Sequence, residues 1–250
     1  MRTLLAAASV VMTAMAQAAD ITVLATPGVR EAYLELVPLF ERASGNKVAT
    51  TWAGTADVMK RMKAGEVFDA VILASNSLEE LTDTGRLMAG SRADIARSLV
   101  GVAVRAGSPK PDISSPEALK RTLAAAKTIG ISTGPSGVYL TGLFEKMGML
   151  AELKPKFRTP PSGAAIGELI AKGEAEIGFQ QVSELIHFPG IQFVGPLPAA
   201  LQQTTVFAGG VHAGAREPDA ARAFLKFLSA PEHAAVLQKH GLDLGTASPY

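Results

Sequence analysis

The sequence predicts an α/β protein in which helices cover a largely parallel sheet. Apolar runs rich in β-branched residues alternate with amphipathic segments, and several of these runs are apolar at every position. A strand that is apolar at every position is typical of a sheet covered by helices on both faces. Alternation of strands and helices along the chain predicts parallel pairing.

Eight strands are predicted in order along the chain from these apolar runs. Their limits are residues 21–25, 47–52, 70–74, 99–105, 128–132, 176–179, 191–194 and 205–211. The 15 Pro and 24 Gly residues are spread along the whole sequence. This distribution indicates many ordered turns between the elements rather than disorder.

The segments between the strands have the spacing of amphipathic helices. In the first of them, Tyr33, Leu36 and Phe40 recur at helical spacing and Gly45 ends the helix. The other predicted helices cover residues 56–64, 77–84, 117–126, 139–147 and 165–172, and two more begin at Pro218 and Pro231. Proline suits these last two starts because the first helical turn needs no N–H at that position.

The first residues have the three-part pattern of a secretory signal peptide, which we assign to residues 1–18. Arg2 gives a positive start, residues 4–15 form an almost unbroken apolar run, and residues 16–18 (Ala-Gln-Ala) provide the small residues of a cleavage site. The run is too short for a membrane-spanning helix, which needs about 20 residues. We therefore expect a periplasmic protein whose mature chain starts near Ala19.

Charge and cysteine content exclude several functions. The chain has 24 Lys and Arg against 23 Asp and Glu, so loss of Arg2 with the signal peptide leaves 23 of each and no net charge. Such a balance is not the basic footprint of a nucleic-acid-binding protein. The chain has no Cys, and its four His have no ligand-like spacing. We therefore expect no disulfide, no metal and no cofactor.

Small polar residues stand where predicted strands turn into helices. These turns are Thr26-Pro27-Gly28, Gly54-Thr55, Ser75-Asn76, residues 132–137 (STGPSG) and residues 180–183 (QQVS), and Ser162-Gly163 opens a further helix. In open α/β sheets, ligands bind at the carboxyl ends of the strands. Each helix start there offers unpaired N–H groups and about half a positive charge. Several starts around one cleft would bind an anion, although each turn alone is also ordinary helix capping.

We predict that these turns contact a bound anion. The predicted ligand-binding residues are Thr26, Gly28, Gly54, Thr55, Ser75, Ser132, Ser136, Gly137, Tyr139, Gln180 and Gln181. Tyr139 is included because it follows Ser136 at a helix start and carries a hydroxyl. Glu184 and His187 follow the glutamine turn and are the candidates for a catalytic base if the protein is an enzyme.

Several segments resemble the periplasmic molybdate-binding proteins of ABC transporters over essentially the whole mature chain. They include FERASGNKV at residues 40–48, WAGT at 52–55, KAGEVFDAV at 63–71, AKGEAEIG at 171–178 and SAPE at 229–232. The resemblance implies a type II periplasmic binding fold, with two α/β lobes joined by a two-strand hinge. Lobe 1 would comprise residues 20–98 plus 208–250, and lobe 2 residues 99–207. It also implies a monomer that delivers a small anion to the membrane subunits of an ABC importer.

The ligand positions depart from those of family members that bind molybdate or tungstate. Those members have Ser after the first strand, a Ser pair after the second and Tyr after the sixth. The matching residues here are Pro27, Thr55-Ala56 and Gln180-Gln181. Pro27 has neither a hydroxyl nor an N–H, and glutamine offers an amide in place of a phenol. The glutamines suit a planar carboxylate or a mixed polar ligand better than a tetrahedral oxyanion.

Two further stretches resemble a branch of the same family that includes aconitate isomerase. They are GPSGVY at residues 134–139 and GFQQVSEL at residues 178–185. The leading hypothesis is an ABC-importer binding protein for an oxyanion or an organic acid. The alternative is an aconitate isomerase-like enzyme that acts on a tricarboxylate, which requires a positioned base and a cradle for negative charge. A sensor subunit that presents its closed form to a membrane receptor is a third hypothesis.

Overall fold

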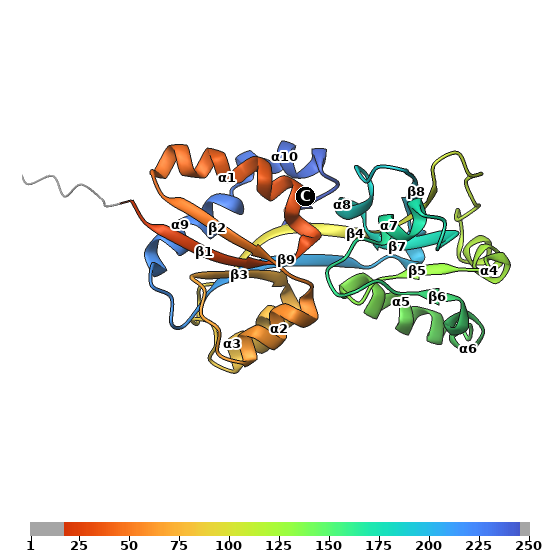
Figure 1. Ribbon diagram of the computed structural model, residues 1–250, viewed down its shortest axis with the longest axis horizontal. Coiled ribbons are helices and arrows are strands. Elements are labelled where there is room, and N and C mark those ends of the chain that lie inside the picture. Colours follow the sequence, from red (N-terminus) through yellow and green to blue (C-terminus); the bar gives the residue numbers. More distant parts are fainter. Residues whose placement is uncertain (1–17, 246–250) are drawn as a thin grey trace, which may run out of the picture.

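Ten strands form one sheet in the computed structural model, which describes residues 18–245. The strand order is β2-β1-β3-β9-β4-β7-β5-β6, and β8 and β10 also pair with β4. Figure 1 shows two α/β halves side by side, connected by β4 and β9. The predicted signal peptide, up to residue 17, lies outside the described residues. Within residues 18–245, no helix is both long enough and apolar enough to cross a membrane.

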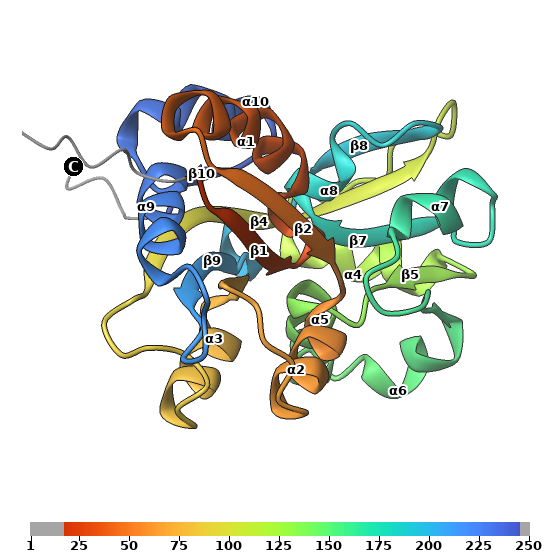
Figure 2. The ribbon, with the colours of Figure 1, turned by 60° about the vertical axis from the view of Figure 1, so that its left-hand side comes forward.

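The first half is built on three parallel strands. Its elements are β1 (Asp20–Ala25), η1 (Pro27–Val29), α1 (Arg30–Ser44), β2 (Lys47–Trp52), α2 (Thr55–Lys63), β3 (Ala70–Ala74), α3 (Ser75–Asp83), α9 (Pro218–Leu228), η4 (Pro231–His233), α10 (Ala234–Lys239) and β10 (Asp243–Leu244). Successive side chains of a strand point to opposite faces. Val23 accordingly packs in the core cluster with α1 and α9, whereas Leu24 packs with α2 and α3. Figure 2 shows these helix pairs on opposite sides of the sheet.

The second half repeats this layering around β5 and β7. Its elements are α4 (Pro116–Ala125), β5 (Ile129–Ile131), α5 (Pro135–Lys146), α6 (Leu150–Leu153), η2 (Lys154–Lys156), β6 (Phe157–Arg158), α7 (Ile166–Ala171), β7 (Ile177–Gln181), α8 (Val182–Leu185), β8 (Ile191–Pro196) and η3 (Ala199–Leu201). Val102 packs with Leu140 and Phe144 on one face of its strand, and Ala103 packs with the α7 residues Ile166 and Ile170 on the other.

Two long strands run from one half to the other. β4 (Ala93–Arg105) pairs with β9 (Thr204–Val211) through residues 93–99, and then with β7 through residues 100–104. All pairings of these two strands are antiparallel. The sheet is therefore parallel at its ends and antiparallel in the middle, which departs from the largely parallel sheet that we predicted. The predicted lobe limits, 98/99 and 207/208, fall inside β4 and β9.

Most predicted elements agree with the structure within a few residues, and the exceptions have local causes. The fourth strand begins at Ala93 instead of residue 99 because β9 and β10 pair with its polar first part. Helix α5 begins at Pro135 instead of residue 139 because extended Gly134 caps it and proline occupies the first helical position. The short elements α6, α8, β6 and β10 were not predicted.

Candidate functional site

A small cavity of about 40 Å³ lies between the two halves. We call it the inter-lobe cavity. The first half, with β9, contributes Thr26, Pro27, Gly28, Gly54, Thr55 and Phe207. The second half contributes Ser132, Thr133, Gly134, Pro135, Ser136, Gly163, Ala164, Gln180, Gln181 and Glu184. Apart from Phe207, which lies within β9, these residues come from the ends of β1, β2, β5 and β7 and the segments that follow them, together with the turn before α7. The carboxyl ends of strands from both halves thus meet at one place, as expected for a ligand site of an open α/β sheet.

Two helices start at the inter-lobe cavity from opposite sides. Helix α2 begins after Gly54 and α5 begins after Gly134, and both glycines have extended backbones that direct the chain into the helix. The first intrahelical bonds are made by Val58 and Val138, whose N–H groups donate to the carbonyls of Gly54 and Gly134 at 2.9 and 3.1 Å. The N–H groups of the residues in between have no intrahelical partner. They form the positive end of each helix dipole at the cavity, although Pro135, the first residue of α5, contributes no N–H.

Buried polar atoms without partners also face the inter-lobe cavity. Thr26 is 3% exposed and Gln181 is 1% exposed. Within residues 18–245, neither Thr26 Oγ1 nor Gln181 Oε1 has a hydrogen-bond partner. The other end of the Gln181 amide donates to Thr205 Oγ1 at 3.0 Å. A buried polar atom without a partner is costly and uncommon in folded proteins. The two atoms are therefore positioned to bind a water or a ligand.

Glu184 is the one ionisable side chain among the described residues that line the inter-lobe cavity. The Gln180 amide donates to Glu184 Oε1 at 2.8 Å, while Gln180 Oε1 accepts from the Ile166 N–H at 2.9 Å. Both ends of the Gln180 amide are thus occupied within the protein. Part of the Glu184 surface faces a neighbouring hollow, but burial of its carboxyl group raises its pKa to about 7. Glu184 can therefore hold or release a proton near neutral pH.

Two larger hollows flank the inter-lobe cavity. The α1-side hollow, of about 480 Å³, shares Pro27, Gly163, Ala164 and Glu184 with the cavity and also includes Arg30, Glu31, Glu168 and His187. The α3-side hollow, of about 430 Å³, shares Thr55, Thr133, Gly134 and Pro135 with the cavity and also includes Ser75 and Tyr139. The cavity alone admits one small group. A longer ligand would have to reach into one of these hollows or separate the two halves.

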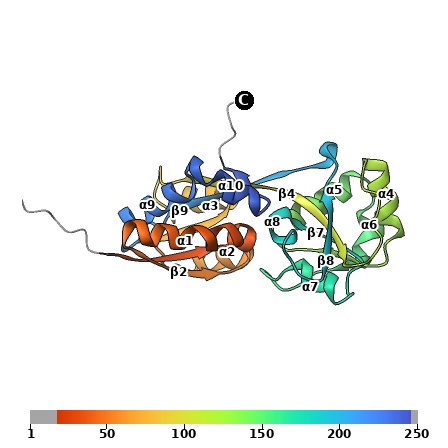
Figure 3. The ribbon, with the colours of Figure 1, turned by 90° about the horizontal axis from the view of Figure 1, so that it is seen from above.

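The two halves, which Figure 3 shows side by side from above, touch each other around the inter-lobe cavity. Ser183 Oγ donates to the Gly28 carbonyl at 2.7 Å, which joins α8 to the turn after β1. Gly54 faces Ser162 and Gly163 so closely that a Cβ atom added to Gly163 would lie 2.7 Å from the Gly54 nitrogen. His187 Nε2 lies 3.0 Å from the Lys239 carbonyl oxygen. These contacts correspond to a closed arrangement.

Eight of the eleven predicted ligand-binding residues line the inter-lobe cavity, namely Thr26, Gly28, Gly54, Thr55, Ser132, Ser136, Gln180 and Gln181. Gly137 instead packs directly against the Ser132 carbonyl. Ser75 and Tyr139 lie in the α3-side hollow, where the Tyr139 hydroxyl donates to the Leu201 carbonyl at 2.8 Å. Of the two candidate bases, Glu184 faces the cavity, and His187 lies in the α1-side hollow.

Sequence reasoning missed Phe207 and Ala164 as cavity residues. Phe207 lies in the middle of β9, and a Cβ atom added to Gly28 would overlap its ring. Nothing local distinguishes this phenylalanine from an ordinary core residue. Trp52, at the end of β2, packs edge-on against Tyr33 with 5.1 Å between the ring centroids, and the Arg30 guanidinium lies 5.6 Å from the centroid of the Trp52 ring.

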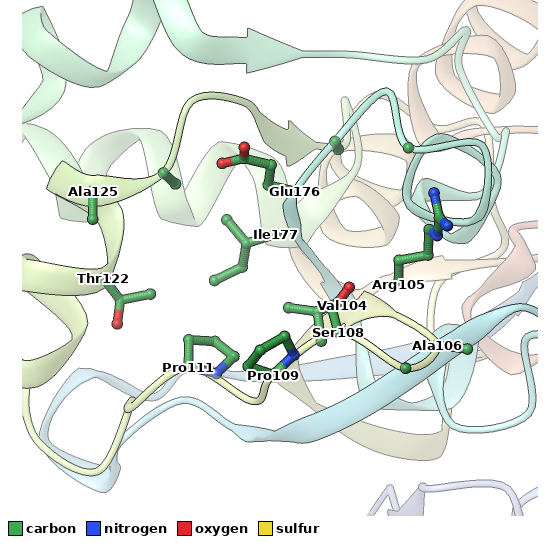
Figure 4. A pocket seen from close by; sticks show the side chains of 14 residues that line it. Val104, Arg105, Ala106, Ser108, Pro109, Pro111, Thr122, Ala125, Glu176 and Ile177 are labelled. Carbon is green, nitrogen blue, oxygen red and sulfur yellow. The ribbon is translucent and has the colours of Figure 1, made fainter.

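A larger hollow of about 600 Å³ lies at the outer end of the second half (Figure 4). It is lined by the chain after β4 and by parts of α4 and β7, including Arg105, Pro109, Thr122 and Glu176. The Glu176 carboxylate accepts from the Lys127 N–H at 2.7 Å. Every lining residue comes from β4 or the second half, away from the strand ends that form the inter-lobe cavity. Size alone therefore does not identify this hollow as the site.

The chain is similar to known proteins over nearly its whole length. A family model described as bacterial extracellular solute-binding protein matches residues 21–243. Aconitate isomerase of a Pseudomonas species is 35% identical over 92% of this chain and 89% of that protein. The molybdate-binding protein ModA of Azotobacter vinelandii is 26% identical over 92% of each chain.

Solved structures share the same architecture. The periplasmic molybdate-binding protein of Azotobacter vinelandii aligns with a TM-score of 0.76 at 20% identity, covering 92% of this chain and 100% of that one. The sulfate-binding protein SubI of Mycobacterium tuberculosis aligns with a TM-score of 0.75 at 19% identity, covering 90% of this chain and 86% of that one. The predicted type II periplasmic binding fold is thereby confirmed.

Proposed function

Because this chain belongs to the bacterial extracellular solute-binding protein family, we propose that it captures a small organic anion between its two halves in the periplasm. One observation carries the proposal. The starts of α2 and α5, one from each half, line the same cavity as Thr26, whose Oγ1 has no hydrogen-bond partner within residues 18–245. Among the described residues that line this cavity, none is Lys or Arg. Helix starts and hydroxyls therefore supply the attraction for negative charge.

An organic acid suits the inter-lobe cavity better than molybdate or sulfate. Pro27 provides no N–H at the turn after β1, and the Gln180 amide is already occupied by Glu184 and Ile166. A tetrahedral oxyanion needs donors around all of its oxygens, whereas a carboxylate needs them around two. The flanking hollows leave room for further carboxylate groups of the same ligand. The identity of 35% with an aconitate isomerase, against 26% with a ModA protein, supports the same choice.

Binding would favour the closed arrangement, because a ligand held by both halves stabilises the state in which both can reach it. We propose that the membrane subunits of an ABC importer recognise this closed monomer. Titration calorimetry with trans-aconitate, citrate, malate, molybdate and sulfate tests the ligand class. At a ligand concentration 100 times Kd, the stability should rise by about 2.7 kcal/mol, which corresponds to roughly 5–10 °C in Tm for a chain of this size.

Variants at the inter-lobe cavity and outside it sharpen the test. Thr26→Val removes the unpaired hydroxyl and keeps the side-chain shape. It should weaken carboxylate binding about 10- to 150-fold, since a hydrogen bond to a charged group contributes roughly 1.5–3 kcal/mol. Ser108→Ala, at the large hollow of the second half, is the matched control and should leave affinity unchanged. The absence of heat and of a thermal shift with all five anions would overturn the proposal.

Isomerisation of the bound acid is a second candidate function, and the position of Glu184 in the cavity lining favours it. Moving a double bond within aconitate requires a base that removes a proton beside a carboxylate and returns one at another carbon. Glu184 lines the inter-lobe cavity and has a pKa of about 7, so it can do both. The helix starts would stabilise the negative charge that develops on the carboxylate.

An ultraviolet assay with trans-aconitate separates the two candidates. Turnover that is lost in Glu184→Gln and kept in His187→Gln would establish Glu184 as the base. His187 is the other candidate base, and it lies in the α1-side hollow and outside the inter-lobe cavity. Tight binding without turnover in the wild type would eliminate the isomerase and leave the binding protein.

A further inference from the structure

Glu184 places a carboxyl group inside a cavity that is otherwise built to attract negative charge. Of its two oxygens, Oε1 accepts from the Gln180 amide at 2.8 Å. The amide is fixed at its other end because Gln180 Oε1 accepts from the Ile166 N–H at 2.9 Å. Hydrogen bonds therefore hold both ends of the Gln180 amide in the orientation that donates to Glu184. Within the described residues, no salt bridge to Glu184 is formed.

The side chains around Glu184 do not neutralise its carboxylate as a bound proton would. Arg30, Glu31, Glu168 and His187 line the α1-side hollow with Glu184, and within the cavity the remaining lining residues carry no charge. The Arg30 guanidinium lies over the Trp52 ring at 5.6 Å and, within the described residues, forms no salt bridge with Glu184. Of the other charged or titratable residues of the hollow, Glu31 and Glu168 are acidic and His187 is not. The hollow therefore does not offset the negative charge that a bound anion adds beside Glu184.

We infer that Glu184 makes the inter-lobe cavity bind its anion together with one proton, shared between the Glu184 carboxyl group and an oxygen of the ligand. The inference rests on the proposed function. Two oxygens that both carry negative charge repel each other when no cation lies between them, and the repulsion is strongest where water is excluded. A proton on either oxygen turns this repulsion into a charge-assisted hydrogen bond. The ligand either brings that proton on a hydroxyl or acid group, or Glu184 takes it from water.

The source of the proton divides anions into two classes. A ligand with its own donor, such as a hydroxy acid, can bind while Glu184 is ionised. A fully ionised ligand without a donor requires Glu184 to be protonated. Because the pKa of Glu184 is about 7 in the empty cavity, the protonated form is already common at neutral pH. Affinity for the second class should therefore fall tenfold for each pH unit above about 7, with one proton taken up per ligand.

Calorimetry with trans-aconitate and sulfate, both fully ionised and without a donor at pH 8, tests the inference. Titrations in Tris and in HEPES, buffers with different heats of ionisation, give the number of protons taken up. We expect about one proton per bound anion at pH 8, and a loss of about tenfold in affinity between pH 8 and pH 9. Glu184→Gln keeps the acceptor for Gln180 and carries a permanent N–H donor. It should show no proton uptake and a flat pH profile.

A control and the contrary results complete the test. Glu174→Gln changes an exposed glutamate on the same half and should behave like the wild type. Unfolding of Glu184→Gln in urea without ligand shows whether the variant is folded. Binding by the wild type without proton uptake, or an equal pH profile in Glu184→Gln, would overturn the inference and leave the proposed function intact. Failure of both anions to bind at any pH between 6 and 9 would overturn the inference, and failure of citrate, malate and molybdate as well would overturn the proposed function with it.

Discussion

Gly54→Ala tests whether the halves must close on the ligand. Gly54 caps α2 with φ −64° and ψ 155°, a conformation that alanine adopts without strain. In the closed arrangement, however, a Cβ atom at this position would overlap Ser162 Oγ and the Gly163 nitrogen on the other half. The Gly163 side of the contact is backbone with φ +80°, which cannot move aside as a side chain would. The added methyl group therefore opposes closure while it leaves each half intact.

The expected loss of ligand affinity in Gly54→Ala follows from the free-energy cost of overpacking. An extra methylene in a well-packed contact costs roughly 1–3 kcal/mol. If that cost falls on the closed state alone, ligand affinity drops by roughly 5- to 150-fold. Stability without ligand should not fall with it, because replacing Gly by Ala at a compatible backbone position lowers the entropy of the unfolded chain.

The assay is calorimetry with the strongest-binding organic acid, combined with urea unfolding of the free protein. Gly142→Ala is the matched control, since no atom lies within 4 Å of a Cβ atom at this helical position. It should raise stability by up to about 1 kcal/mol through helix propensity and leave affinity unchanged. Wild-type affinity in Gly54→Ala would refute the closed arrangement as the binding state. Equal losses of affinity and of stability would show a folding defect instead.

Three further changes have defined outcomes. The Asp69 carboxylate accepts four hydrogen bonds, from Thr22 N and Oγ1 and from the N–H groups of Arg216 and Glu217, at 2.7–2.9 Å. Asp69→Asn turns an N–H₂ group toward two of these donors and should lower the free energy of unfolding in urea by about 2–4 kcal/mol. Burial raises the pKa of Asp69, but these hydrogen bonds outweigh it and hold the pKa below its ordinary value. Wild-type stability should therefore fall as the pH drops below about 4, and the slope should be smaller in Asp69→Asn; equal slopes would contradict the assignment. Tyr139→Phe removes the bond to the Leu201 carbonyl and should cost about 1 kcal/mol of stability with no change in affinity, whereas a loss of affinity would place Tyr139 in the ligand site. Phe224→Ala, in the core between Tyr33 and Phe40, should cost about 3–5 kcal/mol in the same unfolding measurement, and a cost under about 1 kcal/mol would contradict the packing.

The strands and turns of the fold could be predicted because their signals are local. Residues 47–52 and 70–74 form β2 and β3 with the predicted limits, since a run rich in β-branched residues in the first and an apolar run in the second both stop at turn residues. The first part of β4 lacked such a signal. Asp94 and Arg97 interrupt its apolar pattern, and the segment is a strand because β9 and β10 pair with it from distant parts of the chain.

The residues of the candidate site also fall into those that the local sequence predicts and those that depend on distant parts of the chain. The polar turns were predicted because they follow strands, and the sheet brings most of them to the inter-lobe cavity. Tyr139 has the right neighbours in sequence, but its hydroxyl donates a hydrogen bond to the carbonyl of distant Leu201. The approach of Gly54 to Gly163 and of Gly28 to Phe207 depends on how segments far apart in the chain meet. No local pattern contains that information.

Diffraction from crystals grown with trans-aconitate, or with whichever organic acid binds most strongly, tests the capture of an anion between the halves most directly. We expect a carboxylate of the ligand in the inter-lobe cavity, within hydrogen-bond distance of Thr26 Oγ1 and of backbone N–H groups at the starts of both α2 and α5. A ligand bound to one half alone, or seated in the large hollow beside Arg105 and Glu176, would contradict the account.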